Sequence, residues 1–122
     1  MVSERRADGA LEADILGVLW VADEPLTPAE VNDRLDSGLA YTTVLTVLTR
    51  LWTKGLLERT RHGRAYAYRA LMSESELATQ RMTDTLAAVS NRNEVLARFV
   101  GTLPKRDLAA LRRLLDQPGP ER

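Results

Sequence analysis

Hydroxyl side chains are concentrated in one segment, residues 40–55, which reads AYTTVLTVLTRLWTKG. Thr42, Thr46 and Thr49 lie three or four residues apart, so a helix would place them on one face. Threonine is a mediocre helix former that gains little from water, and charged residues are the usual choice for a solvated face. Short hydroxyls suit a face that presses against a flat polar surface. The segment is therefore interpreted as the recognition helix of a DNA-binding domain.

The chain offers little for catalysis. It has no cysteine and one histidine, His62, which lies in a predicted hairpin turn. A Ser-His-Asp mechanism would need that histidine to face a serine and to be oriented by a carboxylate. The sequence has no glycine-rich phosphate loop and no histidine pair with metal-ligand spacing. It therefore predicts no catalytic residue, no cofactor and no metal.

The other face of the 40–55 segment is apolar. It carries four residues at i, i+3, i+4 and i+7: Val44, Val47, Leu48 and Leu51. This spacing is typical of a buried helix face. At the end of the segment, Arg50 and Lys54 suit the negative end of a helix dipole, and Gly55 suits the left-handed position that closes a helix.

Charge is unevenly distributed along the sequence, although the formal net charge is zero. Residues 1–36 hold nine acidic and three basic residues, whereas residues 41–70 hold six basic residues and one acidic residue. Residues 71–122 hold eight basic and seven acidic residues. Because phosphates respond to a local basic patch rather than to the total charge, this distribution favours DNA binding by residues 41–70.

A first helix is predicted from about Gly9 to Trp20, with Asp8 as its N-cap. Its apolar stripe comprises four residues: Leu11, Ile15, Val18 and Leu19. Glu12 and Asp14 are expected on the opposite, polar side. Trp20 is expected to pack in the core.

A second helix is predicted from Thr27 to about Leu35. Thr27 is its N-cap, Pro28 takes the first helical position, and Glu30 closes a capping box. Its apolar residues are Ala29, Val31 and Leu35. Because the threonine-rich helix follows after a short turn, the arrangement is that of a helix-turn-helix.

A two-stranded hairpin is predicted next, from residues 56–61, a turn at 62–64 and a return strand at 65–70. Tyr66 and Tyr68 share one face of it, and its tip is basic. Three helices followed by a hairpin form the plan of a winged helix-turn-helix. In that plan the wing places cations beside the DNA backbone while the recognition helix occupies the major groove.

Three short helices are predicted after the hairpin, at about 74–89, 94–100 and 105–115. Ser73 and Glu76 form a second capping box, Asn93 caps the next helix, and Gly101 belongs to a break. The fold class is therefore mainly α with a small β-hairpin. The domains expected are a winged helix-turn-helix domain at 8–71, a C-terminal helical dimerisation region at 72–116 and a disordered tail at 117–122.

The last two predicted helices are too short to be stable alone. They could fold back on the winged domain or pair with a second copy. A reader of double-stranded DNA normally needs two half-sites, which a two-fold dimer provides, so we expect a homodimer. Its interface is expected to use the apolar residues of these helices: Leu86, Val89, Val95, Leu96, Phe99, Leu108, Leu111, Leu114 and Leu115.

Several motifs together resemble one known family. They are Leu16-Gly17-Val18-Leu19-Trp20, the Thr27-x-x-Glu30-Val31 helix start, the segment from Ala40 to Leu56, and Gly63-Arg64-Ala65-Tyr66-x-Tyr68. In this order and spacing they resemble the penicillinase repressors of the BlaI/MecI type, densely over residues 10–70 and by helix pattern over 71–116. The resemblance implies a homodimeric winged-helix repressor on a palindromic operator. Relatives control β-lactamase genes.

Three features depart from that family. Where some relatives have a basic residue, this chain has Leu45, which could contact a thymine methyl group. Relatives controlled by a membrane-bound sensor protease are cleaved at an Asn-Phe bond, and the matching pair here is Arg98-Phe99. The resemblance thus implies a sensor protease as a partner, but this pair does not favour the same cleavage. The absence of cysteines argues against the copper-responsive branch.

The residues expected to contact DNA come from the threonine-rich helix and the hairpin: Tyr41, Thr42, Thr43, Leu45, Thr46, Arg50, Lys54, Arg61 and Arg64. The threonines are assigned to base edges and nearby phosphates, and the hairpin arginines to phosphates or the minor groove. Two alternatives stay open. Arg50 and Lys54 meet phosphates or only compensate the helix dipole, and Tyr41 donates to a phosphate or only packs.

The expected function is that of a DNA-binding transcriptional repressor that is not an enzyme. A winged-helix protein-interaction module would not need the basic cluster at 41–70, and a hydrolase would need a catalytic constellation. A ligand-sensing regulator would need a pocket between the winged domain and the C-terminal helices, and no polar cluster in 71–116 indicates one. With no long apolar run, no signal-peptide pattern and no cysteine, a cytoplasmic protein is expected.

Overall fold

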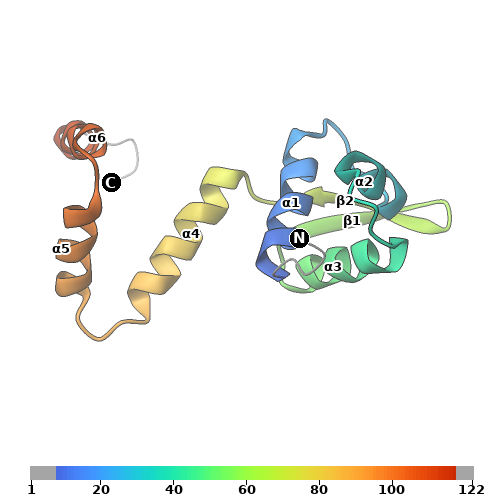
Figure 1. The fold of residues 1–122 in the computed structure, drawn as a ribbon, viewed down its shortest axis with the longest axis horizontal. Coiled ribbons are helices and arrows are strands. Elements are labelled where there is room, and N and C mark those ends of the chain that lie inside the picture. The colour runs from blue at the N-terminus through green and yellow to red at the C-terminus, as the bar shows by residue number, and fades with distance from the viewer. Residues whose placement is uncertain (1–7, 118–122) are drawn as a thin grey trace. The chain divides into compact units, whose positions relative to one another are not determined.

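The computed structural model describes residues 8–117 and contains six helices and one hairpin in that range (Figure 1). The elements are α1 (Asp8–Val21), α2 (Pro28–Leu35), α3 (Tyr41–Thr53), β1 (Leu57–His62), β2 (Ala65–Ala70), α4 (Glu74–Ala87), α5 (Arg92–Thr102) and α6 (Lys105–Asp116). The predicted element order is confirmed. Contacts divide the chain into two units between Ala78 and Thr79, which we call the N-terminal and C-terminal units.

Helix α1 supplies one wall of the core of the N-terminal unit. Its buried apolar residues are Leu11, Ile15, Leu16 and Leu19. The prediction that Glu12 lies on the polar side was wrong, because its side chain is buried and the residue is 8% exposed. Asp8 is the first residue of the helix. The structure describes its backbone but not its side chain, so its capping role stays a prediction.

Helix α2 begins with the predicted capping box. The Glu30 amide donates to the Thr27 hydroxyl at 3.3 Å, and the Thr27 amide donates to the Glu30 carboxylate at 2.9 Å. The second of these bonds stabilises the charged carboxylate and so lowers the pKa of Glu30. Pro28 and Val31 are buried, whereas Ala29 is exposed, so its assignment to the apolar side was wrong.

Helix α3 packs its predicted face into the core. Its four buried residues are Val44, Val47, Leu48 and Leu51. Gly55 follows the helix with φ 84°, the left-handed backbone that glycine adopts without strain. The helix and the turn that ends it were therefore predicted correctly.

The hairpin pairs β1 with β2 in antiparallel register, from Leu57 opposite Ala70 to His62 opposite Ala65. Leu26 joins it as a single bridge, because its amide donates to the Tyr68 carbonyl at 2.9 Å and its carbonyl accepts from the Tyr68 amide at 2.7 Å. Tyr68 is fully buried. These bonds fix the base of the hairpin against the helices, and its loop projects beyond them (Figure 1).

The segment after the hairpin is held to the N-terminal unit. The indole Nε1 of Trp20 donates to the Met72 carbonyl at 2.8 Å, and Trp20 packs against the core. The predicted capping box of Ser73 and Glu76 starts α4, and Leu77 is buried in the same core. Trp20 therefore has the packing role that was predicted, with a hydrogen bond added.

Two predictions about α5 were wrong. Its N-cap is Asn91, whose Oδ1 accepts from the Glu94 amide at 3.0 Å, whereas Asn93 lies inside the helix. The helix also continues through Gly101 to Thr102. An internal glycine costs a helix only about 1 kcal/mol, so Gly101 does not break it. In the predicted tail, residues 118–122 lie outside the described residues.

None of the helices in the described part of the chain is long and apolar enough to cross a membrane.

Candidate nucleic-acid interface

The threonine-rich face of α3 is turned away from the core. Thr42 and Thr46 are exposed, and Thr43, Leu45 and Thr49 are partly exposed. Tyr41 is exposed at the first position of the helix. A ligand can therefore reach all five residues of α3 that were predicted to contact DNA and that precede Arg50 in the sequence: Tyr41, Thr42, Thr43, Leu45 and Thr46.

The start of α3 also suits an anion. Its N-cap, Ala40, has no side chain to accept from the first amides, and the first turn contains no acidic residue. The positive end of the helix dipole is thus left without a compensating carboxylate from its own first turn. A phosphate at this end would be stabilised by the same groups.

Lys54 has a partner that the sequence pattern did not indicate. Its Nζ lies 3.0 Å from Oε2 and 3.3 Å from Oε1 of Glu12, which is 42 residues away along the chain. The Lys54 side chain is half exposed, whereas that of Glu12 is almost fully buried. Lys54 is therefore held to α1 by a charge-assisted bond, a role that neither phosphate binding nor dipole compensation describes.

The hairpin presents two arginines and a histidine at its tip. Arg61, His62 and Arg64 are exposed, and Gly63 between the strands has φ 67°. Arg69, the basic residue of β2, is instead ion-paired with Glu58 at 2.8 Å. The two predicted hairpin contacts, Arg61 and Arg64, thus lie on the exposed end, in the same unit as α3.

Arg59 was missed by the sequence reasoning. Its guanidinium carbon lies 3.6 Å from the ring centroid of Trp52 and 4.0 Å from that of Tyr66. Trp52 is in the last turn of α3, and Arg59 and Tyr66 are on β1 and β2. The alternation of residues along the two strands indicates that Arg59 and Tyr66 share a face of the hairpin. It does not indicate that α3 contributes a second ring, that of Trp52, to the same arginine.

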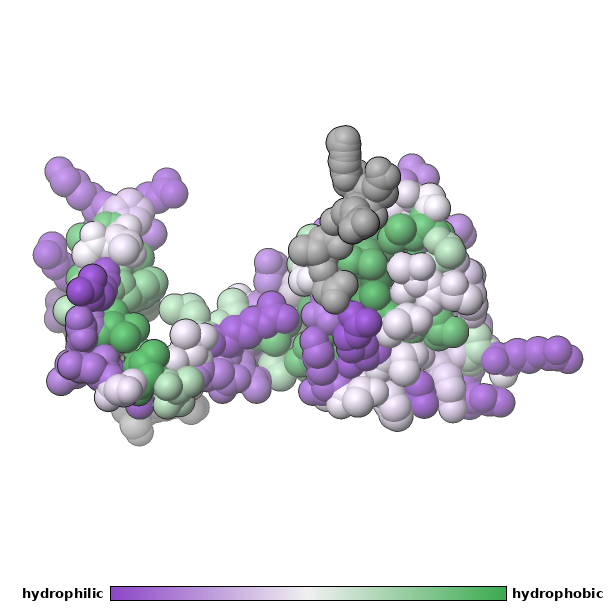
Figure 2. Space-filling view, turned by 60° about the horizontal axis from the view of Figure 1, so that its bottom comes forward, coloured by the Kyte–Doolittle hydropathy of each residue, from purple (hydrophilic) through white to green (hydrophobic). Residues whose placement is uncertain are grey.

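The C-terminal unit leaves apolar side chains uncovered. No residue of α5 or α6 is buried. Phe99 and Leu96 are both more than 40% exposed, and Leu115 is 72% exposed. The space-filling view shows hydrophobic residues along these helices (Figure 2).

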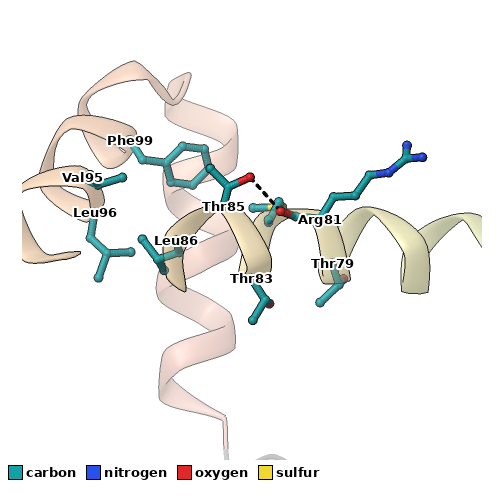
Figure 3. A pocket seen from close by; sticks show the side chains of 9 residues that line it. Thr79, Arg81, Thr83, Thr85, Leu86, Val95, Leu96 and Phe99 are labelled. Atoms are coloured by element: carbon teal, nitrogen blue, oxygen red, sulfur yellow. Dashed lines mark hydrogen bonds between the residues drawn. The ribbon is translucent and has the colours of Figure 1, made fainter. Parts of the chain in front are cut away.

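A hollow of about 570 Å³ lies between α4 and α5 in this unit (Figure 3). Its lining is mostly apolar and includes Met82, Leu86, Val95, Leu96 and Phe99. Four of the residues predicted to form a dimer interface therefore come together here: Leu86, Val95, Leu96 and Phe99. Groups of acidic residues or histidines that could hold a metal ion are absent from the part of the chain that the structure describes.

Comparison with known proteins identifies relatives over almost the whole chain. The penicillinase repressor family model matches residues 9–117. The transcriptional regulator BlaI of two Mycobacterium tuberculosis strains, CDC 1551 / Oshkosh and H37Rv, is 38% identical over 112 residues, which cover 88% of this chain and 81% of the relative.

Solved structures overlap less closely. The transcriptional regulator PcaV of Streptomyces coelicolor, solved with its natural ligand, has 28% identity and a TM-score of 0.48, covering 94% of this chain and 75% of its own. The MepR–DNA complex of Staphylococcus aureus has 19% identity and a TM-score of 0.48, covering 83% and 82%. Since both TM-scores are below 0.5, the assignment is based on the sequence matches. By those matches, the chain belongs to the penicillinase repressor family.

Proposed function

We propose that this protein is a DNA-binding transcriptional repressor that acts as a homodimer on a palindromic operator. The observation that carries the proposal lies in the N-terminal unit, where both sets of predicted contact residues are exposed. There the threonine-rich face of α3 and the basic tip of the hairpin belong to one packed body. Membership of the penicillinase repressor family supports the same function. From this membership we also propose that the protein regulates β-lactam-response genes.

The residues of α3 would read bases. Thr42, Thr43 and Thr46 can donate to or accept from base edges in the major groove, and Leu45 can contact a thymine methyl group. Arg61 and Arg64 would contact phosphates beside the groove. Arg50 is exposed near the end of α3 and is proposed as a phosphate contact.

Thr46→Ala should weaken binding to the operator by about 1 kcal/mol, roughly five-fold, because one hydroxyl contact to a base edge is lost. Binding to a scrambled duplex should be unchanged. Fluorescence anisotropy with both duplexes measures the difference. An equal loss on both would show that Thr46 does not read sequence.

Arg64→Ala should lower affinity on every sequence and reduce the slope of log K against log salt by about one unit, because one phosphate contact is removed. The matched control is Arg69→Ala, which removes a hairpin arginine that Glu58 already neutralises. The control should leave the slope unchanged. If Arg64→Ala had the wild-type salt slope, the hairpin tip would not be part of the DNA interface.

The C-terminal unit would form the dimer interface by packing against the same unit of a second copy. An apolar surface without a core of its own is expected where a second copy packs. The residues proposed for this interface are Leu86, Val89, Val95, Leu96, Phe99, Leu108, Leu111, Leu114 and Leu115. A sensor protease would be a further partner. Its cleavage at Arg98-Phe99 would require α5 to unwind, because both residues lie inside that helix.

The decisive experiment is anisotropy binding to the DNA upstream of the protein's own gene, against a scrambled duplex, across a salt series. Tight and salt-dependent binding of two protomers, with a clear preference over the scramble, would establish the repressor function. Weak and equal binding to that duplex, to a pool of genomic fragments and to the scramble would favour the protein-interaction module.

A further inference from the structure

Three side chains from three elements form one stack in the N-terminal unit. Trp52 ends α3, Arg59 lies in β1 and Tyr66 lies in β2. The guanidinium of Arg59 is close to both rings, at 3.6 Å from the Trp52 centroid and 4.0 Å from the Tyr66 centroid. Both distances are well inside the range of about 6 Å at which a cation is attracted by a ring.

The aromatic rings are the groups that hold Arg59. Within the described chain, no carboxylate forms a hydrogen bond or an ion pair with it. Lys54 and Arg69, its neighbours in the basic segment, each have an acidic partner. A planar guanidinium can lie flat against two rings at once, which a compact ammonium group cannot do.

The stack reaches the arginine proposed to contact DNA. Arg61 is paired with Tyr66 across the hairpin, and its guanidinium carbon lies 5.3 Å from the Tyr66 ring. Trp52 belongs to the last turn of α3, so its contact with Arg59 joins the hairpin to that helix. A two-stranded hairpin alone is marginally stable. A contact from its middle to the end of α3 would therefore limit how far the hairpin tip can move.

We propose that Arg59 is a positioning residue. By stacking between Trp52 and Tyr66 it couples the hairpin to α3 and sets the orientation from which Arg61 meets the phosphate backbone. The inference rests on the proposed DNA-binding function. The alternative is that Arg59 itself contacts a phosphate, and for that role its positive charge alone would be sufficient.

The test uses Arg59→Lys in the full-length chain, because this variant keeps the charge and loses the flat stack. We expect operator affinity to fall about five-fold and amide hydrogen exchange near Thr60 and Arg61 to rise by a similar factor in the free protein. Tyr66→Phe, which keeps the ring, should match wild type, whereas Tyr66→Leu should behave like Arg59→Lys. Circular dichroism confirms that each variant remains folded.

A double-mutant cycle gives the second readout. In the Arg59→Lys background, Arg61→Ala should cost less affinity than it does in wild type, whereas Thr46→Ala should cost the same in both. Wild-type affinity and exchange in Arg59→Lys, or full additivity with Arg61→Ala, would overturn the proposal. Failure of the DNA-binding function would appear separately, as a wild-type protein that does not prefer the operator, and the exchange data would still decide whether Arg59 couples the hairpin to α3.

Discussion

Phe99→Asp should dissociate the proposed homodimer and lower operator affinity by at least about 100-fold. Phe99 is 43% exposed in the single chain and lines the hollow between α4 and α5. If a second copy covers this hollow, the substitution buries a carboxylate among Leu86, Val95 and Leu96. An unpaired buried charge costs several kcal/mol, and this cost is subtracted directly from the free energy of dimerisation.

The size of the effect on DNA binding follows from the two half-sites. A dimer that engages one half-site holds its second reading surface at a high effective concentration near the other. A monomer loses that advantage on every operator, even though its α3 and hairpin are intact. The loss should therefore appear on the full operator and be small on an isolated half-site.

Sedimentation velocity and anisotropy measure the two parts of this prediction. Wild type should sediment as a dimer and Phe99→Asp as the 13.6 kDa chain. The matched control is Val21→Asp, which also replaces an exposed apolar residue, one that is 83% exposed but lies in α1. A variant at Phe99 that remains dimeric would place the interface elsewhere.

The elements of this fold could be predicted because each has a local cause. The period of Val44, Val47, Leu48 and Leu51 predicts α3 and its buried face, and hydroxyl residues followed by glutamate predict the starts of α2 and α4. The exposed threonine face of α3 follows from the same period. These features depend on residues within one or two turns of each other.

Contacts between distant segments could not be predicted in the same way. Glu12 was expected to face solvent because a carboxylate usually does. It is buried, and Lys54 from the end of α3 supplies its counter-charge. The stack of Arg59 between Trp52 and Tyr66 depends on where the end of α3 meets the hairpin. At α5, either Asn91 or Asn93 could cap a helix locally, so the pattern alone does not separate them.

Lys54→Met should destabilise the folded protein by about 2 kcal/mol, because it leaves the carboxylate of Glu12 buried without its cation. Breaking a fully buried ion pair in this way costs about 3–5 kcal/mol. The Lys54 side chain is half exposed, so water can partly replace it and the cost is reduced. Glu12→Gln should cost less, since Lys54 can then turn to solvent.

Urea denaturation of four proteins measures the coupling: wild type, Lys54→Met, Glu12→Gln and the double variant. The double variant should be more stable than the sum of the single losses implies, because the neutral side-chain amide that replaces the Glu12 carboxylate needs no counter-charge. Lys105→Met is the matched control, since Lys105 is exposed at the start of α6 and should change stability by less than about 0.5 kcal/mol. Strict additivity of the two changes would mean that the 3.0 Å contact contributes nothing.

Lys54→Met also distinguishes two roles of this lysine, a phosphate contact and an ion pair with Glu12. A lysine that contacts phosphate contributes about one unit to the salt slope of DNA binding, and its loss leaves stability nearly unchanged. A lysine held by Glu12 is already neutralised, so its loss should lower stability and leave the slope as in wild type. Lys54→Met measured under conditions where it is fully folded therefore decides the matter. A slope reduced by one unit would show that Lys54 contacts DNA, and an unchanged slope would leave it as the link between α1 and the end of α3.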